Sequence, residues 1–147
     1  MEDLKQDNVP YITFSSQMGD ENAARAVQPH LIELRTLLRK YCNNTYCKEV
    51  DEFAPVLRVD GDGWYWEFEG CEKLRLSKKY RYITIDIGMP RSKWENVEPK
   101  GIKSYLFIHL KNALDLMTRR LKKEKYIVNE GDLWSDFKKV EEEFLET

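Results

Sequence analysis

Hydrophobic residues recur at every third or fourth position in three segments of this chain, which is the spacing of one face of a helix. The first stripe consists of Val27, Leu31, Leu34, Leu38 and Tyr41. Because a proline deep inside a helix removes a backbone hydrogen bond, Pro29 either opens this helix or kinks one that begins near Asp20. The pattern predicts a first helix that ends before Asn43.

The two other stripes lie in the second half of the chain. Their members are Leu106, Leu110, Ala113, Met117 and Leu121 in one segment, and Leu133, Trp134, Phe137, Val140 and Phe144 in the other. Pro99 suits the first turn of the earlier helix. Asn129 or Asp132 is the expected cap of the later one. The sequence therefore predicts three main helices.

Strict alternation of apolar and polar residues predicts strands elsewhere. The clearest run alternates Ile83, Ile85 and Ile87 with Tyr82, Thr84 and Asp86. Such alternation is typical of a sheet with one buried face and one solvated face. Residues 11–16 (YITFSS) and 56–59 (VLRV) are expected to form further strands, with a loop over residues 48–55.

These elements together predict a single α+β domain over residues 1–147, with residues 1–8 as a flexible tail. The expected architecture is an antiparallel sheet of about four strands with three main helices. At least two of the helices should pack on one face of the sheet.

The segment GDGWYWEFEG, residues 61–70, is the most aromatic in the chain. Asp60 and Asp62 begin the pattern of a calcium-binding loop, but Trp64 and Phe68 occupy positions that such a loop fills with oxygen ligands. A tight turn over residues 60–63 is therefore favoured.

A strand following this turn would direct its side chains alternately to its two faces. Trp64, Trp66 and Phe68 share one parity and are expected in the core, beneath the helices. Tyr65, Glu67 and Glu69 have the opposite parity. They are expected to form a small acidic and aromatic surface patch.

The charge is unevenly distributed along the chain, although the formal net charge is only −2. Residues 49–72 contain eight acidic residues and one basic residue, whereas residues 73–125 contain fifteen basic and five acidic ones. Residues 126–147 are acidic again, with seven acidic residues against two lysines. Two interpretations stay open: these segments pair with one another in the fold, or an acidic face steers a partner.

The composition argues against several classes of protein. Three cysteines do not form a disulfide framework, and neither His30 nor His109 has a second metal ligand at helical spacing, so we expect no metal and no cofactor. There is no apolar run of membrane-spanning length and no phosphate-binding glycine motif. An acidic, polar start favours the cytoplasm. The overall acidity disfavours nucleic-acid binding, because such domains are usually basic.

The order of the parts resembles a known family. A short strand and helix lead into "VLRVDGDGWYWEFEG" and "KLRLSKKYRYITIDIGMP", followed by "RSKW", "NALDLMTRRLKK" and "DLWSDF". Over residues 11–145 this texture resembles the small cytoplasmic immunity proteins of bacterial polymorphic-toxin and contact-dependent growth-inhibition systems. The resemblance implies a non-enzymatic protein that neutralises a co-inherited toxin, often a nuclease, by tight binding to it.

The acidic residues suggest where such a toxin would bind. A nuclease site is basic because it binds phosphate, so an acidic face with an aromatic anchor would complement it. The predicted partner-binding residues are Asp60, Asp62, Tyr65, Glu67 and Glu69, extended by Glu49, Asp51 and Glu52. The alternative is a small enzyme or ligand-binding domain that uses a cleft between sheet and helix near Glu67, Glu69 and His109.

Overall fold

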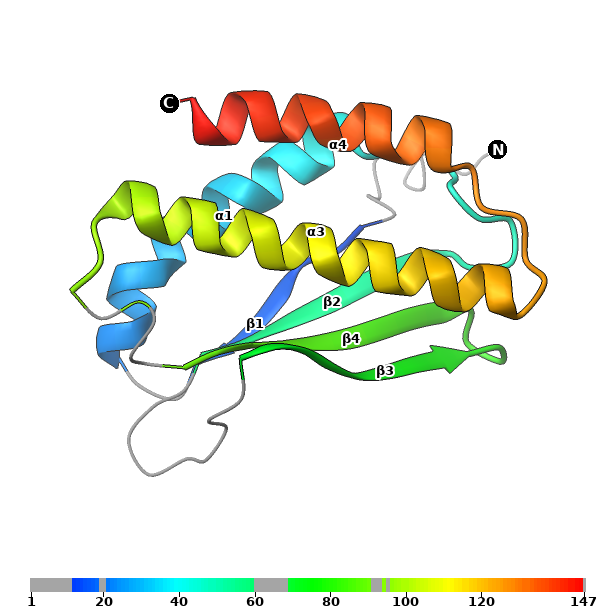
Figure 1. Ribbon diagram of the computed structural model, residues 1–147, viewed down its shortest axis with the longest axis horizontal. Coiled ribbons are helices and arrows are strands. Elements are labelled where there is room, and N and C mark those ends of the chain that lie inside the picture. The colour runs from blue at the N-terminus through cyan, green and yellow to red at the C-terminus, as the bar shows by residue number, and fades with distance from the viewer. Residues whose placement is uncertain (1–11, 19–20, 60–68, 91–93, 95, 147) are drawn as a thin grey trace, which may run out of the picture.

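The computed structural model describes residues 12–18, 21–59, 69–90, 94 and 96–146. In chain order the elements are β1 (Ser15–Met18), α1 (Glu21–Tyr41), β2 (Glu52–Val59), β3 (Gly70–Ser77), β4 (Tyr82–Met89), α3 (Pro99–Lys123) and α4 (Glu130–Leu145) (Figure 1). The α+β class, a sheet of four strands and three main helices are thereby confirmed.

The sheet has the strand order β1-β2-β4-β3 and is mixed rather than antiparallel. The β1–β2 and β2–β4 pairs are parallel, and only β3 and β4 pair in antiparallel fashion. The antiparallel expectation fails because strands that are consecutive in sequence were assumed to be neighbours. Instead, β4 turns back from β3 and lies between β3 and β2, so that it runs in the same direction as β2.

Strand β2 begins four residues earlier than predicted, within the segment that was expected to be a loop. Phe53, Pro55, Leu57 and Val59 are all buried on one face. Pro55 pairs in register with Ile85. Backbone groups alternate in direction along a parallel strand, and the Phe53 carbonyl accepts a bond from Thr13 on the β1 side. The missing N–H of Pro55 therefore falls toward the edge strand, before regular pairing with β1 starts at Ser15.

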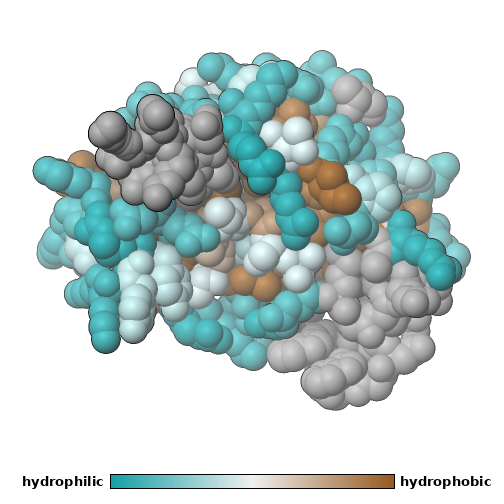
Figure 2. Space-filling view, turned by 180° about the vertical axis from the view of Figure 1, so that it is seen from behind, coloured by the Kyte–Doolittle hydropathy of each residue, from teal (hydrophilic) through white to brown (hydrophobic). Residues whose placement is uncertain are grey.

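All three helices lie on one side of the sheet, with α3 over the strands and α4 outermost (Figure 1). The predicted stripe of α3 is fully buried: Leu106, Leu110, Ala113, Met117 and Leu121. The rings of Phe107 and Phe137 stack at 4.7 Å between centroids and join α3 to α4. From behind, hydrophilic side chains cover most of the surface, with only small hydrophobic patches between them (Figure 2).

The helix starts agree with the sequence signals. Helix α1 begins at Glu21, next to Asp20, and contains Pro29. Helix α3 has Pro99 in its first turn. The side chain of Asn129 caps α4, because its Oδ1 accepts a bond from the Asp132 backbone N–H at 3.2 Å.

One prediction for the sheet is wrong and another lies outside the described residues. Asp86, expected on the solvated face, is buried, and its Oδ2 lies 3.0 Å from Nε of Arg58 on β2. The core positions predicted for Trp64, Trp66 and Phe68 fall in residues 60–68, outside the described part of the chain.

Candidate partner-binding site

Glu69 lies immediately before β3, which begins at Gly70. Gly70 has φ +102°, a conformation that residues with a Cβ rarely adopt. Tyr105 and His109 occupy successive turns on one side of α3, since they are four residues apart. The Tyr105 hydroxyl donates to Oε2 of Glu69 at 2.7 Å. Sequence positions 69 and 105 are thereby joined across the gap between sheet and helix.

His109 lies beside this pair. Its Nε2 is 3.9 Å from the same Glu69 oxygen, and its ring centroid is 4.3 Å from that of Tyr105. Burial lowers the pKa of His109 below its ordinary value of 6.5, and the nearby Glu69 opposes that shift only in part. The imidazole is therefore neutral at pH 7 and does not cancel the charge of Glu69.

Burial also fixes the protonation of the other two groups at this site. It raises the pKa of the Tyr105 hydroxyl, and the bond to Glu69 raises it further, so Tyr105 remains a donor. It raises the pKa of the Cys71 thiol to about 11. The Cys71 Sγ donates to the His109 carbonyl at 3.8 Å. A protonated thiol directed at a carbonyl is a poor nucleophile, so the Cys71–His109 contact lacks the chemistry of a catalytic pair.

A shallow pocket of about 260 Å³ lies next to these residues, between β3 and α3. It is lined by Gly70, Cys71, His109, Asn112, Asp115 and Leu116. Ligand pockets usually enclose about 300–1,000 Å³. The pocket therefore suits one inserted side chain better than a whole metabolite.

Two hydrophobic side chains on the same helix are exposed to solvent. Ile108 is 55% exposed and Leu116 is 37% exposed. Ile108 and Leu116 lie outside the stripe that the sequence predicts as buried, Leu106 to Leu121. A second periodicity was present, because Tyr105, His109, Asn112 and Leu116 also share one helix face. That signal could have identified this side of α3 as a separate surface.

The acids at the beginning of β2 lie at the other end of the sheet. Gly70 pairs with Gly88, which lies opposite Arg58, so Glu69 is near the last residues of β2. Glu52 is the first residue of that strand, roughly 23 Å away along its length. The structure does not bring Glu69 together with Glu49, Asp51 and Glu52.

These three acids make contacts of their own. Arg81 holds Asp51 with two bonds, at 3.0 Å from Nε and 3.1 Å from Nη2, and also donates to the Lys48 carbonyl at 2.7 Å. The Thr13 hydroxyl donates to Glu52 at 2.5 Å, and the Cys47 thiol lies 3.5 Å from Glu49. At this end of the sheet Asp51 of the acidic segment pairs with Arg81 of the basic segment, whereas Glu49 and Glu52 contact neutral groups.

The remaining predicted partner residues, Asp60, Asp62, Tyr65 and Glu67, lie outside the described residues. Within the described part of the chain, no three potential metal ligands are grouped together. No helix among these residues has the length and apolarity needed to cross a membrane.

The fold and this site define a small α+β domain whose polar and aromatic cluster is accessible at one end of a sheet. A family model described as Immunity protein 44 matches residues 11–146, and the chain belongs to that family of immunity proteins. The resemblance inferred from the sequence is thereby confirmed at the level of the family. No curated protein and no solved structure matches the chain.

Proposed function

We propose that this chain neutralises a co-inherited toxin by binding to it in the cytoplasm, without any catalysis of its own. We further propose that the toxin is a nuclease delivered by a polymorphic-toxin or contact-dependent growth-inhibition system. Membership of the immunity protein family supports the neutralising role. The proposed binding site rests on one observation: Glu69 accepts a hydrogen bond from Tyr105 and lies beside a neutral His109.

Charge complementarity supports a basic partner. Residues 60–69 contain four acidic residues and no basic one, and this segment ends at Glu69, directly before β3. A nuclease exposes basic groups where it binds phosphate. Acidic groups opposite such a site would accelerate association and occupy the position of the nucleic acid. Glu49, Asp51 and Glu52 contribute, in this proposal, to the long-range attraction rather than to the central contact.

The surroundings of Glu69 suit a tight protein interface. Aromatic anchors with neighbouring apolar surface carry much of the binding energy in such interfaces. Tyr105 supplies the ring, whereas Ile108 and Leu116 supply exposed apolar area on the same helix. The small pocket beside them can receive one side chain of the toxin.

The first test identifies the partner. The tagged protein is used in a pull-down from its native host, with mass spectrometry of the bound fraction. Recovery of the C-terminal fragment of a large secreted protein, in near-equal amount and stable to high salt, is expected. If no such fragment is recovered while the neighbouring genes are expressed, the proposal fails. A metabolite thermal-shift screen would then address the cleft alternative.

The second test locates the interface. Glu69→Lys is compared with Glu142→Lys, which makes the same charge change on an exposed position of α4. We expect Glu69→Lys to weaken toxin binding by at least about tenfold, equivalent to about 1.4 kcal/mol. Glu142→Lys should leave the affinity unchanged, and circular dichroism should show both variants folded. Equal losses in the two variants would contradict a site at Glu69.

A further inference from the structure

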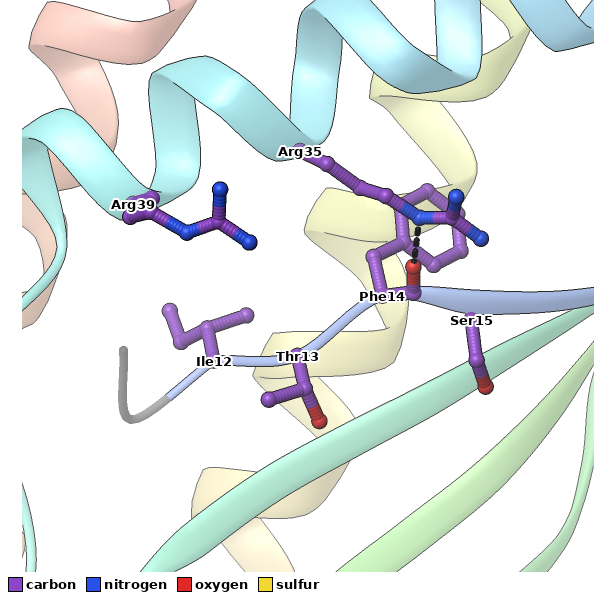
Figure 3. Close-up of a pocket in the computed structure, with 6 residues that line it drawn as sticks. All are labelled: Ile12, Thr13, Phe14, Ser15, Arg35 and Arg39. Atoms are coloured by element: carbon purple, nitrogen blue, oxygen red, sulfur yellow. Dashed lines mark hydrogen bonds between the residues drawn. The ribbon is translucent and has the colours of Figure 1, made fainter. Parts of the chain in front are cut away.

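A second cavity lies at the opposite edge of the sheet, between α1 and the chain segment that enters β1. Its volume is about 220 Å³, and it is lined by Ile12, Thr13, Phe14, Ser15, Arg35 and Arg39. Both arginine side chains extend from α1 toward the strand segment, and the side chains of Ile12 and Phe14 point back toward the helix (Figure 3). The cavity therefore combines two guanidinium groups with an apolar floor.

Arg35 is held in place by neutral acceptors. Its Nε donates to the Phe14 carbonyl at 2.5 Å, and its Nη2 donates to the Ser16 hydroxyl at 3.3 Å. Burial lowers the pKa of this guanidinium, because the cation has lost water. The partly buried cation is thus fixed in direction, and neither acceptor carries a charge.

The two arginines differ from the eight basic side chains that form ion pairs in this fold. Eight basic side chains lie within 3.4 Å of a carboxylate: Lys40, Arg58, Lys78, Arg81, Lys103, Arg119, Arg120 and Lys122. Among the described residues no carboxylate pairs with Arg35 or Arg39, and the cavity lining contains no acid. Two like charges one helical turn apart repel each other, so an anion between them would stabilise both.

Size and chemistry together select the ligand. A planar guanidinium donates in parallel to the two oxygens of a carboxylate. A volume of about 220 Å³ is smaller than an ordinary metabolite pocket, but it accommodates one side chain. The buried side chains of Ile12 and Phe14 provide contact for the methylene groups of such a side chain.

We propose that the cavity between α1 and β1 binds the carboxylate of an aspartate or glutamate side chain on a protein partner. This site is separate from Glu69, because β1 and β3 form opposite edges of the sheet. The site does not depend on the toxin-binding proposal, since a free carboxylate that mimics the side chain can test it.

The test is an NMR titration of the full chain, labelled with ¹⁵N, with N-acetyl-glutamate N-methylamide as the probe. Saturable shifts are expected at residues 12–15 and at the Nε–H signals of Arg35 and Arg39. The corresponding glutamine amide, which has the same shape without the charge, should produce none of them. Equal shifts with the glutamine amide, or no saturable shift with the glutamate probe, would overturn the proposal.

Variants and a second anion sharpen the assignment. Arg39→Gln should lower the affinity for the glutamate probe about tenfold or more. The control Arg75→Gln, on an exposed arginine of β3, should bind it normally. Arg35→Lys keeps the charge but loses the two parallel N–H donors of the guanidinium, so weakened binding of the probe is expected for this variant as well. Unchanged binding in Arg39→Gln would refute the site. Inorganic phosphate that bound this cavity more tightly than the glutamate probe would refute the assignment to a carboxylate.

Discussion

Removal of one hydroxyl group tests how the turn after α1 is attached to the last helix. Tyr46 is 1% exposed, and its hydroxyl donates to Oδ2 of Asp136 on α4 at 2.6 Å. Asn44 donates to the same oxygen at 2.7 Å. The Tyr46 ring packs edge-on against Phe53, with centroids 6.4 Å apart. Tyr46→Phe keeps that ring and removes the hydroxyl, with its bond to the carboxylate and its contact with the Cys42 thiol.

The expected cost follows from the charge of the acceptor. A hydrogen bond to a charged group contributes about 1.5–3 kcal/mol, and its loss leaves the buried Asp136 with Asn44 as its remaining described donor. We therefore expect Tyr46→Phe to lower the free energy of unfolding by about 2 kcal/mol. The melting temperature should fall by about 4–8 °C in a chain of this size.

Urea denaturation of four proteins measures this effect: the wild type, Tyr46→Phe, Asp136→Asn and the double variant. The two single losses should not add, because Asp136→Asn removes the charge that strengthens the bond which Tyr46→Phe removes, and the coupling should be about 1–2 kcal/mol. Tyr80→Phe is the control, because Tyr80 is 67% exposed and its loss should stay within about 0.5 kcal/mol. A Tyr46→Phe loss as small as that of the control, or full additivity, would refute the reasoning.

Three further predictions concern the described residues. Below about pH 6.5 the unfolded chain binds a proton at His109, whereas the folded chain binds it only at lower pH. The free energy of unfolding therefore decreases as the pH is lowered through that window. His109→Gln should flatten this dependence in urea titrations from about pH 7 to about pH 5, and an unchanged slope would contradict the lowered pKa. Leu110→Ala should lower the free energy of unfolding by about 2–5 kcal/mol, because Leu110 is fully buried. Ile108→Ala, on the exposed side of α3, should lower it by less than about 0.5 kcal/mol. Similar losses for the two variants in chemical denaturation would contradict this packing. Asn129→Ala should cost about 1 kcal/mol through loss of the α4 cap, with Asn129→Ser, which keeps an acceptor and adds no charge beside Asp132, close to wild type in melting experiments. A similar loss in both variants would mean that the cap bond is not the cause.

The sequence predicted those features that depend on neighbours along the chain. The stripe from Leu106 to Leu121 fixes α3, because helical periodicity is local. The same is true of the Asn129 cap and of the isoleucines of β4. The early start of β2 was missed because Pro55 normally argues against a strand, and only the arrangement of its neighbours shows that its missing donor is tolerated.

Features that join distant segments could not be predicted in this way. The bond between Tyr105 and Glu69 spans 36 positions, and the identity of one residue does not predict the other as its partner. Asp86 appeared solvated because it alternates with apolar residues, but its burial depends on Arg58 from another strand. The strand order is likewise a property of long-range pairing, which alternation within a single strand does not encode.

The place of β4 in the sheet has a consequence for synthesis. On the ribosome, β2 emerges before residues 60–89, yet its partner on one side is β4, the last strand of the sheet to be made. That edge of β2 stays open until Met89 has left the exit tunnel. Pairing of segments distant in sequence is slow, because chain entropy is lost before contacts form. In the proposed role, a newly made copy can bind a toxin only after this sheet has closed and the two helices that follow β4 have packed on it.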